Sequence, residues 1–376
     1  MKKSIVLFMA ALLTVLPLTA CSGSKDSASS SAPKQGTSEN AMASDEGTGN
    51  STENLEDFDL VLDWYPNAIH AFIYDAIDKG YFADEGLKVN ILFPANSNDA
   101  ISLTAAGRAD AGLYYQNDII IARANENVPV VSIGSVVKDS LDIIASLSEK
   151  GINRPKDLEG KKLGYTATEF GDAVIRKMLE NDGASLDSVK LINVGFDLMS
   201  SMTTGNVDAT FGCFVNHEIP QLEKEGFDMN YFKLSDYGIP NYYALVFVAG
   251  EKNVNNNYEK YHRFLKACLR GFYDMKTDPE GTLDILLKYQ NEENFPLDPD
   301  VEKKSLDVLL PMMEKEFLPF LAQDANVFQE NINWLYDNGL IESKIEPQEI
   351  MYDAIDQDYD DYLNGYADSA TKEGVQ

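Results

Sequence analysis

Short apolar runs alternate with amphipathic segments from residue 58 onward, and this alternation constrains the fold more than any other feature. Apolar runs at 58–64, 89–93, 110–115 and 128–137 predict strands, and 70–79, 100–106 and 118–124 predict the helices between them. Strands that alternate with helices at this spacing favour βαβ units and a largely parallel sheet. We therefore expect an α/β protein.

The pattern recurs further along the chain. Strands are predicted at 161–165, 190–194, 208–215 and 242–249, with helices at 172–180, 199–204 and from 220, and the chain is then helical to about residue 364. A Gly-x-x-Asp turn precedes a strand in both halves, at Gly107 to Asp110 and at Gly205 to Asp208. The echo indicates two related lobes, although Gly-x-x-Asp is also common turn chemistry.

The N-terminus indicates export. Lys2 and Lys3 precede an apolar stretch, 5–18, that is too short to span a membrane comfortably. The run Leu-Thr-Ala-Cys21 then resembles a bacterial lipobox, with a plain secretory signal as the alternative. We expect a signal peptide at 1–20, followed at 21–57 by a lipidated Cys21 and a flexible tether, because this polar segment has almost no aliphatic side chains to bury.

Charge and residue counts exclude several kinds of function. The formal net charge is −30, which disfavours nucleic-acid binding because phosphate backbones require clustered Lys and Arg. Three histidines and three cysteines leave little scope for a metal site or a disulfide framework. Cys213 and Cys268 fall within a predicted strand and a predicted helix, so we expect both in the core.

Aromatic, amide and carboxylate residues gather where four predicted strands end, the edge at which open α/β sheets bind ligands. Each has a structural alternative: Trp64 as core, Asn67 and Asp118 as helix caps, and Glu169 as a first-turn charge. If they share a cleft, such residues suit a flat heterocycle, because rings stack on aromatic faces while amides and carboxylates bond to ring edges. The candidates are Trp64, Asn67 and His70; Tyr115 and Gln116; Glu169 and Gly171; Asn216 and Glu218; and Tyr243.

Two runs carry a family resemblance. They are Leu62-Asp-Trp-Tyr-Pro-Asn-Ala-Ile-His70 and Lys79-Gly-Tyr-Phe-Ala-Asp-Glu-Gly-Leu87. Together they resemble the solute-binding proteins related to thiamine-pyrimidine synthase, and within that group the ABC-importer proteins that bind thiamine pyrimidine precursors. Matches at 107–112, 158–165, 221–226 and 333–340 extend the resemblance over residues 58–345.

The resemblance implies a type II periplasmic-binding fold, in which two α/β lobes close about a hinge over a ligand cleft. Lobe 1 would comprise 58–150 and 245–376, and lobe 2 would comprise 151–244. The protein would be a monomer without cofactor or metal, held outside the cell by a lipid anchor and docking on an ABC permease. Its ligand would be a formylaminopyrimidine or hydroxymethylpyrimidine, with riboflavin-like or sulfonate ligands as alternatives.

The resemblance implies that the candidate residues line the two walls of the ligand cleft. Trp64, Asn67 and His70, with Tyr115 and Gln116, would line the lobe 1 wall, and Glu169, Gly171, Asn216 and Glu218 would face them from lobe 2. A buried carboxylate accepting from an aminopyrimidine forms short, charge-assisted hydrogen bonds. Glu218 is our first choice for that anchor and Glu169 our second.

The same family includes a pyrimidine synthase that uses pyridoxal phosphate, so an enzyme is the alternative. That enzyme needs a lysine and a histidine where this chain has Tyr114 and Asp118, and a cysteine-rich motif where 239–245 contains no cysteine. A lipobox is also out of place on an intracellular synthase. We therefore expect a receptor and not an enzyme.

Overall fold

The computed structural model describes residues 55–96, 98–290 and 296–355, and all of them belong to one unit, Ser51–Gln376. The predicted signal peptide, Cys21 and nearly all of the tether lie outside the described residues. Within the described part of the chain, no helix is both long enough and apolar enough to cross a membrane.

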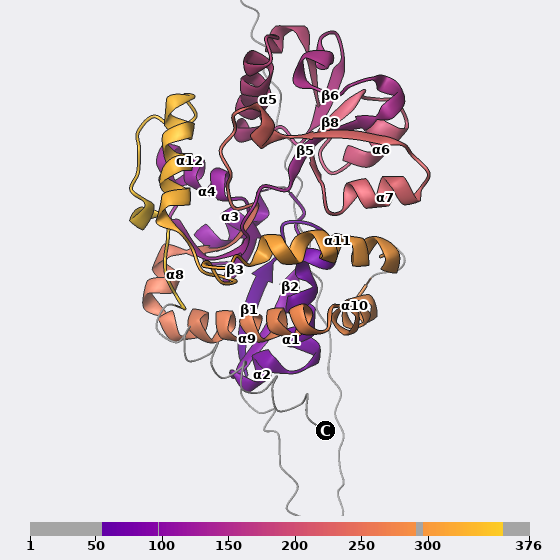
Figure 1. The fold of residues 1–376 in the computed structure, drawn as a ribbon. Coiled ribbons are helices and arrows are strands. Elements are labelled where there is room, and N and C mark those ends of the chain that lie inside the picture. Colours follow the sequence, from indigo (N-terminus) through magenta and orange to yellow (C-terminus); the bar gives the residue numbers. More distant parts are fainter. Residues whose placement is uncertain (1–54, 97, 291–295, 356–376) are drawn as a thin grey trace, which may run out of the picture. The chain divides into compact units, whose positions relative to one another are not determined.

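The first sheet has five strands and defines lobe 1 (Figure 1). β1 runs parallel to β2 and β3, whereas β10 runs antiparallel to β3 and β4. The helices α1 (Ala71–Asp78), α3 (Asp99–Ala105) and α4 (Gln116–Glu126) follow β1, β2 and β3, so strands and helices alternate as predicted. The strand order is β2 (Leu87–Leu92), β1 (Glu56–Val61), β3 (Ala111–Tyr114), β10 (Leu245–Gly250) and β4 (Val130–Val137).

The second sheet repeats this plan in lobe 2. β6 runs parallel to β7 and β8, and β5 runs antiparallel to β8 and β9. Helices α5 (Glu169–Asn181), α6 (Leu198–Thr203) and α7 (Glu218–Lys224) follow its three parallel strands. The strand order is β7 (Lys190–Asn193), β6 (Lys162–Tyr165), β8 (Ala209–Phe214), β5 (Asp142–Leu147) and β9 (Met229–Lys233).

The aspartates of the two Gly-x-x-Asp turns make equivalent hydrogen bonds in the two lobes. Asp110 accepts a hydrogen bond from the backbone N–H of Asp59 at 2.8 Å, and Asp208 accepts one from the N–H of Lys162 at 2.9 Å. Asp110 thereby ties the turn before β3 to β1, and Asp208 ties the turn before β8 to β6. The identical bonds support two structurally related lobes.

The lobe boundary differs from our expectation that lobe 1 extends to residue 150. Residues 142–147 form β5, which pairs with β8 and β9 in the second sheet. The chain therefore passes to lobe 2 within residues 138–141. Local patterning does not reveal this, because an apolar run can serve as a strand in either sheet. The strand β1 also begins inside the predicted tether, at Glu56.

The remaining helices pack mainly on lobe 1. α9 crosses α1, and the ring of Phe58 in β1 stacks on Phe264 in α9 at 4.1 Å. Cys213 in β8 and Cys268 in α9 are fully buried free thiols, which confirms their core placement. The further helices are α2 (Tyr81–Asp84), α8 (Glu251–Asn256), α9 (Tyr258–Thr277), α10 (Pro279–Lys288), α11 (Pro299–Met313) and α12 (Ala325–Asp337). Short 3-10 helices lie at Ala68–His70, Ser148–Lys150, Pro155–Leu158, Leu186–Ser188, Leu234–Tyr237 and Pro347–Glu349.

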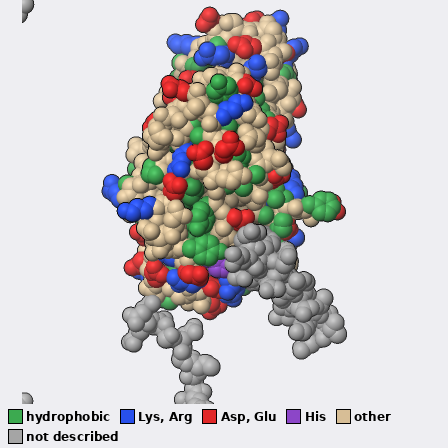
Figure 2. Space-filling model, turned by 90° about the vertical axis from the view of Figure 1, so that its left-hand side faces the viewer, with side chains coloured by type: hydrophobic (Ala, Val, Ile, Leu, Met, Phe, Trp, Pro, Cys, Tyr) green, Lys and Arg blue, Asp and Glu red, His purple; other side chains and the backbone are tan. Residues whose placement is uncertain are grey.

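The acidic side chains are spread over the face of the molecule that Figure 2 shows. Figure 2 shows Asp and Glu side chains scattered among Lys and Arg over one face, without a single acidic patch. This distribution fits a general contribution of charge to solubility.

Candidate functional site

A cavity lies between the two lobes, and all four strand ends singled out in the sequence contribute to it. Its walls therefore come from both sheets, at the edge where α/β proteins place their ligands. Lobe 1 supplies Asp63, Trp64, Asn67 and Ile69 after β1, and Tyr115, Asn117 and Asp118 after β3. Thr166, Thr168, Phe170, Phe211, Gly212, Phe214, His217 and Glu218 line it from lobe 2, with Asp142 of β5 and Tyr242.

Aromatic rings from both lobes meet around this cavity. Trp64 contacts Phe196 edge-on with ring centroids 4.5 Å apart, and Tyr115 of lobe 1 faces Phe214 of lobe 2 at 6.3 Å. Such rings offer flat apolar faces for a planar ligand.

Glu218 begins α7 and is 8% exposed. Its Oε2 accepts a hydrogen bond from the backbone N–H of Phe214 at 2.8 Å, and its Oε1 lies 3.4 Å from Nδ1 of His217. A carboxylate has about four lone-pair positions, so acceptor capacity is left for a ligand.

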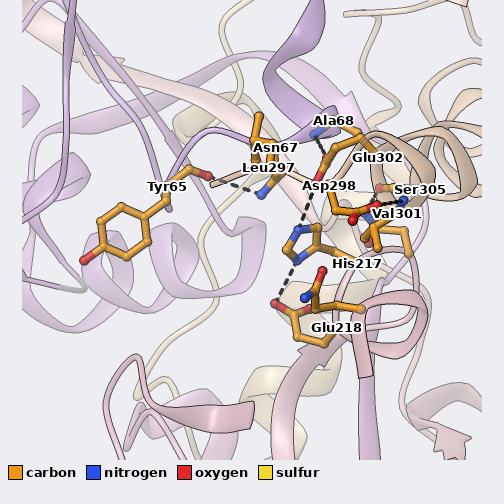
Figure 3. A network of polar contacts seen from close by, with 12 residues as sticks. Tyr65, Asn67, Ala68, His217, Glu218, Leu297, Asp298, Val301, Glu302 and Ser305 are labelled. Carbon is orange, nitrogen blue, oxygen red and sulfur yellow. Dashed lines mark hydrogen bonds and ion pairs between the residues drawn. The ribbon is translucent and has the colours of Figure 1, made fainter. Parts of the chain in front are cut away.

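His217 connects Glu218 to lobe 1 (Figure 3). Its Nε2 lies 3.4 Å from Oε1 of Glu302 in α11, and Oε2 of Glu302 accepts from the backbone N–H of Ala68 at 2.7 Å. Burial disfavours a charged imidazole, but the bonds to Glu218 and Glu302 outweigh it and raise the pKa of His217 to about 10. The imidazolium therefore joins carboxylates from both lobes.

Two further carboxyl groups face the cavity. Burial raises the pKa of Asp118 to about 7, and repulsion from Asp142 and Glu169 adds to the effect. Burial likewise raises the pKa of Asp142 to about 6, against a 2.6 Å hydrogen bond from the Tyr242 hydroxyl. Both groups are enclosed by protein, and the surface they retain contributes to the cavity wall.

Four of the predicted residues, Trp64, Asn67, Tyr115 and Glu218, line the cavity. Asn67 also caps the turn, because its Oδ1 accepts from the N–H of Ile69. No known ligand contact tests these assignments, and they remain predictions.

His70 and Gln116 are fully buried and do not line the cavity. The His70 ring accepts from the N–H of Asn67 and lies 3.0 Å from Asp63. Gln116 accepts from the N–H of Tyr243 at 2.7 Å. Both therefore hold the loops that carry the cavity wall.

The remaining four predicted residues also lie outside the cavity wall. Glu169 is exposed, and the N–H of Gly171 is already bonded to the capping hydroxyl of Thr168 at 3.0 Å. Asn216 donates to Ser305 at 2.9 Å, and the hydroxyl of Tyr243 accepts from the N–H of Asp324. Asn216 and Tyr243 therefore hydrogen-bond to other parts of the fold, and none of the four lines the cavity.

Sequence reasoning missed Asp118, Asp142 and Tyr242 as cavity residues. Asp118 was interpreted as a helix cap, but α4 starts at Gln116 after Tyr115, and no side chain caps it. Asp142 lies on a strand that was not predicted. The Tyr242-Tyr243 pair was the one available signal, but successive side chains in extended chain point to opposite sides, and Tyr242 is the one that faces the cavity.

A second cavity adjoins the first. The two share Trp64, Asn67, His217 and Glu218, so these residues form a wall common to both. The second cavity continues between the 196–200 segment of lobe 2 and the start of α11. Among the described residues, no cluster of three or more His, Cys, Asp or Glu side chains is arranged to hold a metal ion.

The fold is that of the periplasmic binding proteins. The crystal structure of the periplasmic aliphatic sulphonate-binding protein SsuA from Escherichia coli is similar with a TM-score of 0.61, over 79% of this chain and 97% of that one. At 16% identity this likeness concerns the fold alone.

Sequence comparison identifies the family. The NMT1/THI5-like family model matches residues 67–282, and the chain belongs to this family. It is 42% identical to the formylaminopyrimidine-binding protein of Halalkalibacterium halodurans, over 79% of this chain and 90% of that protein. It is 29% identical to the 4-amino-5-hydroxymethyl-2-methylpyrimidine phosphate synthase of Candida albicans, over 58% of this chain and 67% of that protein.

Proposed function

We propose that this chain is the extracytoplasmic solute-binding protein of an ABC importer and that it captures a thiamine pyrimidine precursor of the formylaminopyrimidine type. The observation that carries the proposal is an interlobe cavity that combines aromatic rings with a buried glutamate. The 42% identity to a formylaminopyrimidine-binding protein supports the same ligand class. A lipid on Cys21 would keep the receptor close to its permease.

Trp64 and Tyr115 would stack on the pyrimidine ring, while Glu218 would accept from its amino edge. Asn67, at the wall shared with the second cavity, would contact a substituent of the ring. A sulfonate ligand fits less well, because no Lys or Arg lines either cavity in the described part of the chain.

A thermal-shift panel tests the ligand. Formylaminopyrimidine, hydroxymethylpyrimidine, the thiazole half of thiamine, riboflavin and taurine should be compared, and a pyrimidine at one hundred times its Kd should add about 2.7 kcal/mol to the free energy of unfolding. A response to riboflavin or taurine without any response to the pyrimidines would reject the proposed ligand.

Substitutions test the site. Glu218→Ala and Trp64→Ala should each lose most of the pyrimidine-induced shift, because they remove the anchor and a stacking face. Glu169→Ala is the matched control, since Glu169 is exposed and outside the cavity wall. Full retention of the shift in both cavity variants would show that the ligand binds elsewhere.

The receptor proposal excludes turnover. Overnight incubation of the purified protein with each pyrimidine should return the ligand unchanged by mass spectrometry. Because family members include named synthases, a protein-dependent product would favour the enzyme alternative.

A further inference from the structure

The start of α4 places an amide without any partner in the cavity wall. Asn117 is 1% exposed, and neither its Oδ1 nor its Nδ2 has a hydrogen-bond partner. A buried donor and acceptor left unpaired are unfavourable, and a ligand that supplies the complementary groups recovers that loss. Asn117 therefore points to a ligand edge that can donate and accept.

Several carboxyl groups line the same cavity as this amide. Asp63 is paired with His70 and Glu218 with His217, and Asp142 accepts from Tyr242. Asp118 lines the same cavity without a hydrogen bond or an ion pair to any described residue. No Lys or Arg is present among the cavity's lining residues to balance these groups.

The adjoining cavity is also lined by acidic side chains. It adds Asp197, Asp298 and Glu302 to the shared wall and again contains no Lys or Arg among its described lining residues. The imidazolium of His217, which lines both cavities, is already shared between Glu218 and Glu302, and Lys224 of α7 is paired with Asp298 and Asp300. A ligand substituent that extends into this second cavity therefore also meets acidic groups.

We infer that Asn117, Asp118 and Asp142 form a second polar subsite that binds a hydrogen-donating edge of an uncharged or cationic amino-heterocycle and excludes phosphorylated ligands. The inference rests on the proposed function and deepens it, because it assigns the phosphorylation state of the ligand. Carboxylates accept from amino and ring N–H groups, whereas they repel a phosphate dianion strongly inside a cavity of low dielectric constant. Burial is the main cause of the raised pKa values of Asp118 and Asp142, repulsion from neighbouring carboxylates adds to it, and a donor ligand would relieve that repulsion.

Calorimetric titration tests the inference with two probes that differ only in phosphorylation, 4-amino-5-hydroxymethyl-2-methylpyrimidine and its phosphate. Wild-type protein should bind the free pyrimidine at least about 100-fold more tightly than the phosphate. Asp118→Asn keeps the shape and removes the charge, so it should reduce this discrimination about tenfold. Asn117→Leu removes both polar atoms and should weaken binding of the free pyrimidine about tenfold.

Glu126→Gln is the matched control, because it makes the same charge change at the exposed end of α4 and should leave both affinities unchanged. If circular dichroism shows that Asp118→Asn does not fold, Asp142→Asn supplies the same test. Equal affinity of the wild type for both probes, or unchanged affinities in the folded subsite variants, would overturn the inference and leave the receptor function intact. Binding of neither probe, nor of formylaminopyrimidine, would instead overturn the proposed function and this inference with it.

Discussion

At the scale of single residues, the residues of the 62–70 motif have two different roles. Trp64 and Asn67 line the cavity, whereas His70 is buried between Asp63 and the N–H of Asn67. The histidine therefore shapes the loop that presents the other two. A polar residue near a strand end is a candidate for ligand contact, but its hydrogen bonds decide its role.

Asp118 should make the stability of the protein depend on pH. Its pKa rises from 3.8 to about 7 on folding, so the folded state holds the proton more tightly. That contribution is complete below about pH 4 and is lost as pH rises through 7. Asp118→Asn should thus have a higher free energy of unfolding than the wild type above pH 7, by on the order of 4 kcal/mol, with the difference shrinking toward pH 4.

Thermal unfolding followed by circular dichroism from pH 4 to 8 measures this effect. Glu126→Gln should follow the wild-type curve, because its carboxylate is exposed. A constant difference between Asp118→Asn and wild type across this range would show that Asp118 is ionised throughout.

At the scale of elements, the crossing of α1 and α9 depends on one glycine. The apolar face of α9 is buried, including Phe264, Cys268 and Phe272. On the same face lies Gly271, where an added Cβ would stand 2.1 Å from the carbonyl oxygen of Phe72. Periodicity identifies the buried face, but it does not reveal how near two backbones come.

Gly271→Ala should therefore destabilise the protein in spite of alanine's better helix propensity. Propensity favours Ala by about 1 kcal/mol, whereas overpacking at a backbone contact costs about 1–3 kcal/mol or more. Urea denaturation should show a net loss, and Glu259→Ala at the exposed start of α9 should stay within about 0.5 kcal/mol of wild type. Equal or greater stability of Gly271→Ala would mean that the helices separate freely.

At the scale of the whole described unit, α11 joins the two lobes. Asp298, Glu302 and Ser305 fall at helical spacing on one side of this helix and contact Lys224, His217 and Asn216 of lobe 2. In Figure 1, α11 lies next to α7, in agreement with these contacts. The buried contact of Glu302 should hold the lobes together more strongly than the exposed contact of Lys224, because water screens the exposed ion pair.

Glu302→Gln should favour separation of the lobes. The variant keeps an acceptor for the N–H of Ala68 but loses the charge opposite His217, and weakening a buried charge pair costs about 2–5 kcal/mol. Small-angle X-ray scattering should show a larger radius of gyration without ligand, and pyrimidine affinity should fall at least about tenfold. Lys224→Met, which removes only exposed ion pairs that water screens, should resemble the wild type in both measurements. Unchanged scattering for Glu302→Gln would mean that α11 does not hold the lobes together.

Local patterns account for much of the fold and part of the site. The alternation of strands and helices, the related turns at Asp110 and Asp208, and the four strand ends around the cavity all follow from features a few residues long. The strands β5 and β9 were not predicted, and Tyr242 lines the cavity where Tyr243 does not. Local patterns do not reveal these features because strand partners and side-chain direction depend on contacts between distant segments.

The sequence by itself determined the α/β class, the family and the edge of the sheets at which a ligand would bind, because hydrophobic period and turn chemistry act within a short stretch of chain. Only the tertiary structure decided which polar side chains meet there. In it, His70, Gln116 and Asn216 hydrogen-bond to other parts of the fold. Asn117 has no hydrogen-bond partner, and Asp118 and Asp142 come from different lobes to line one cavity. Burial and hydrogen bonding between distant segments set these roles, and neither is encoded in the spacing of neighbouring residues.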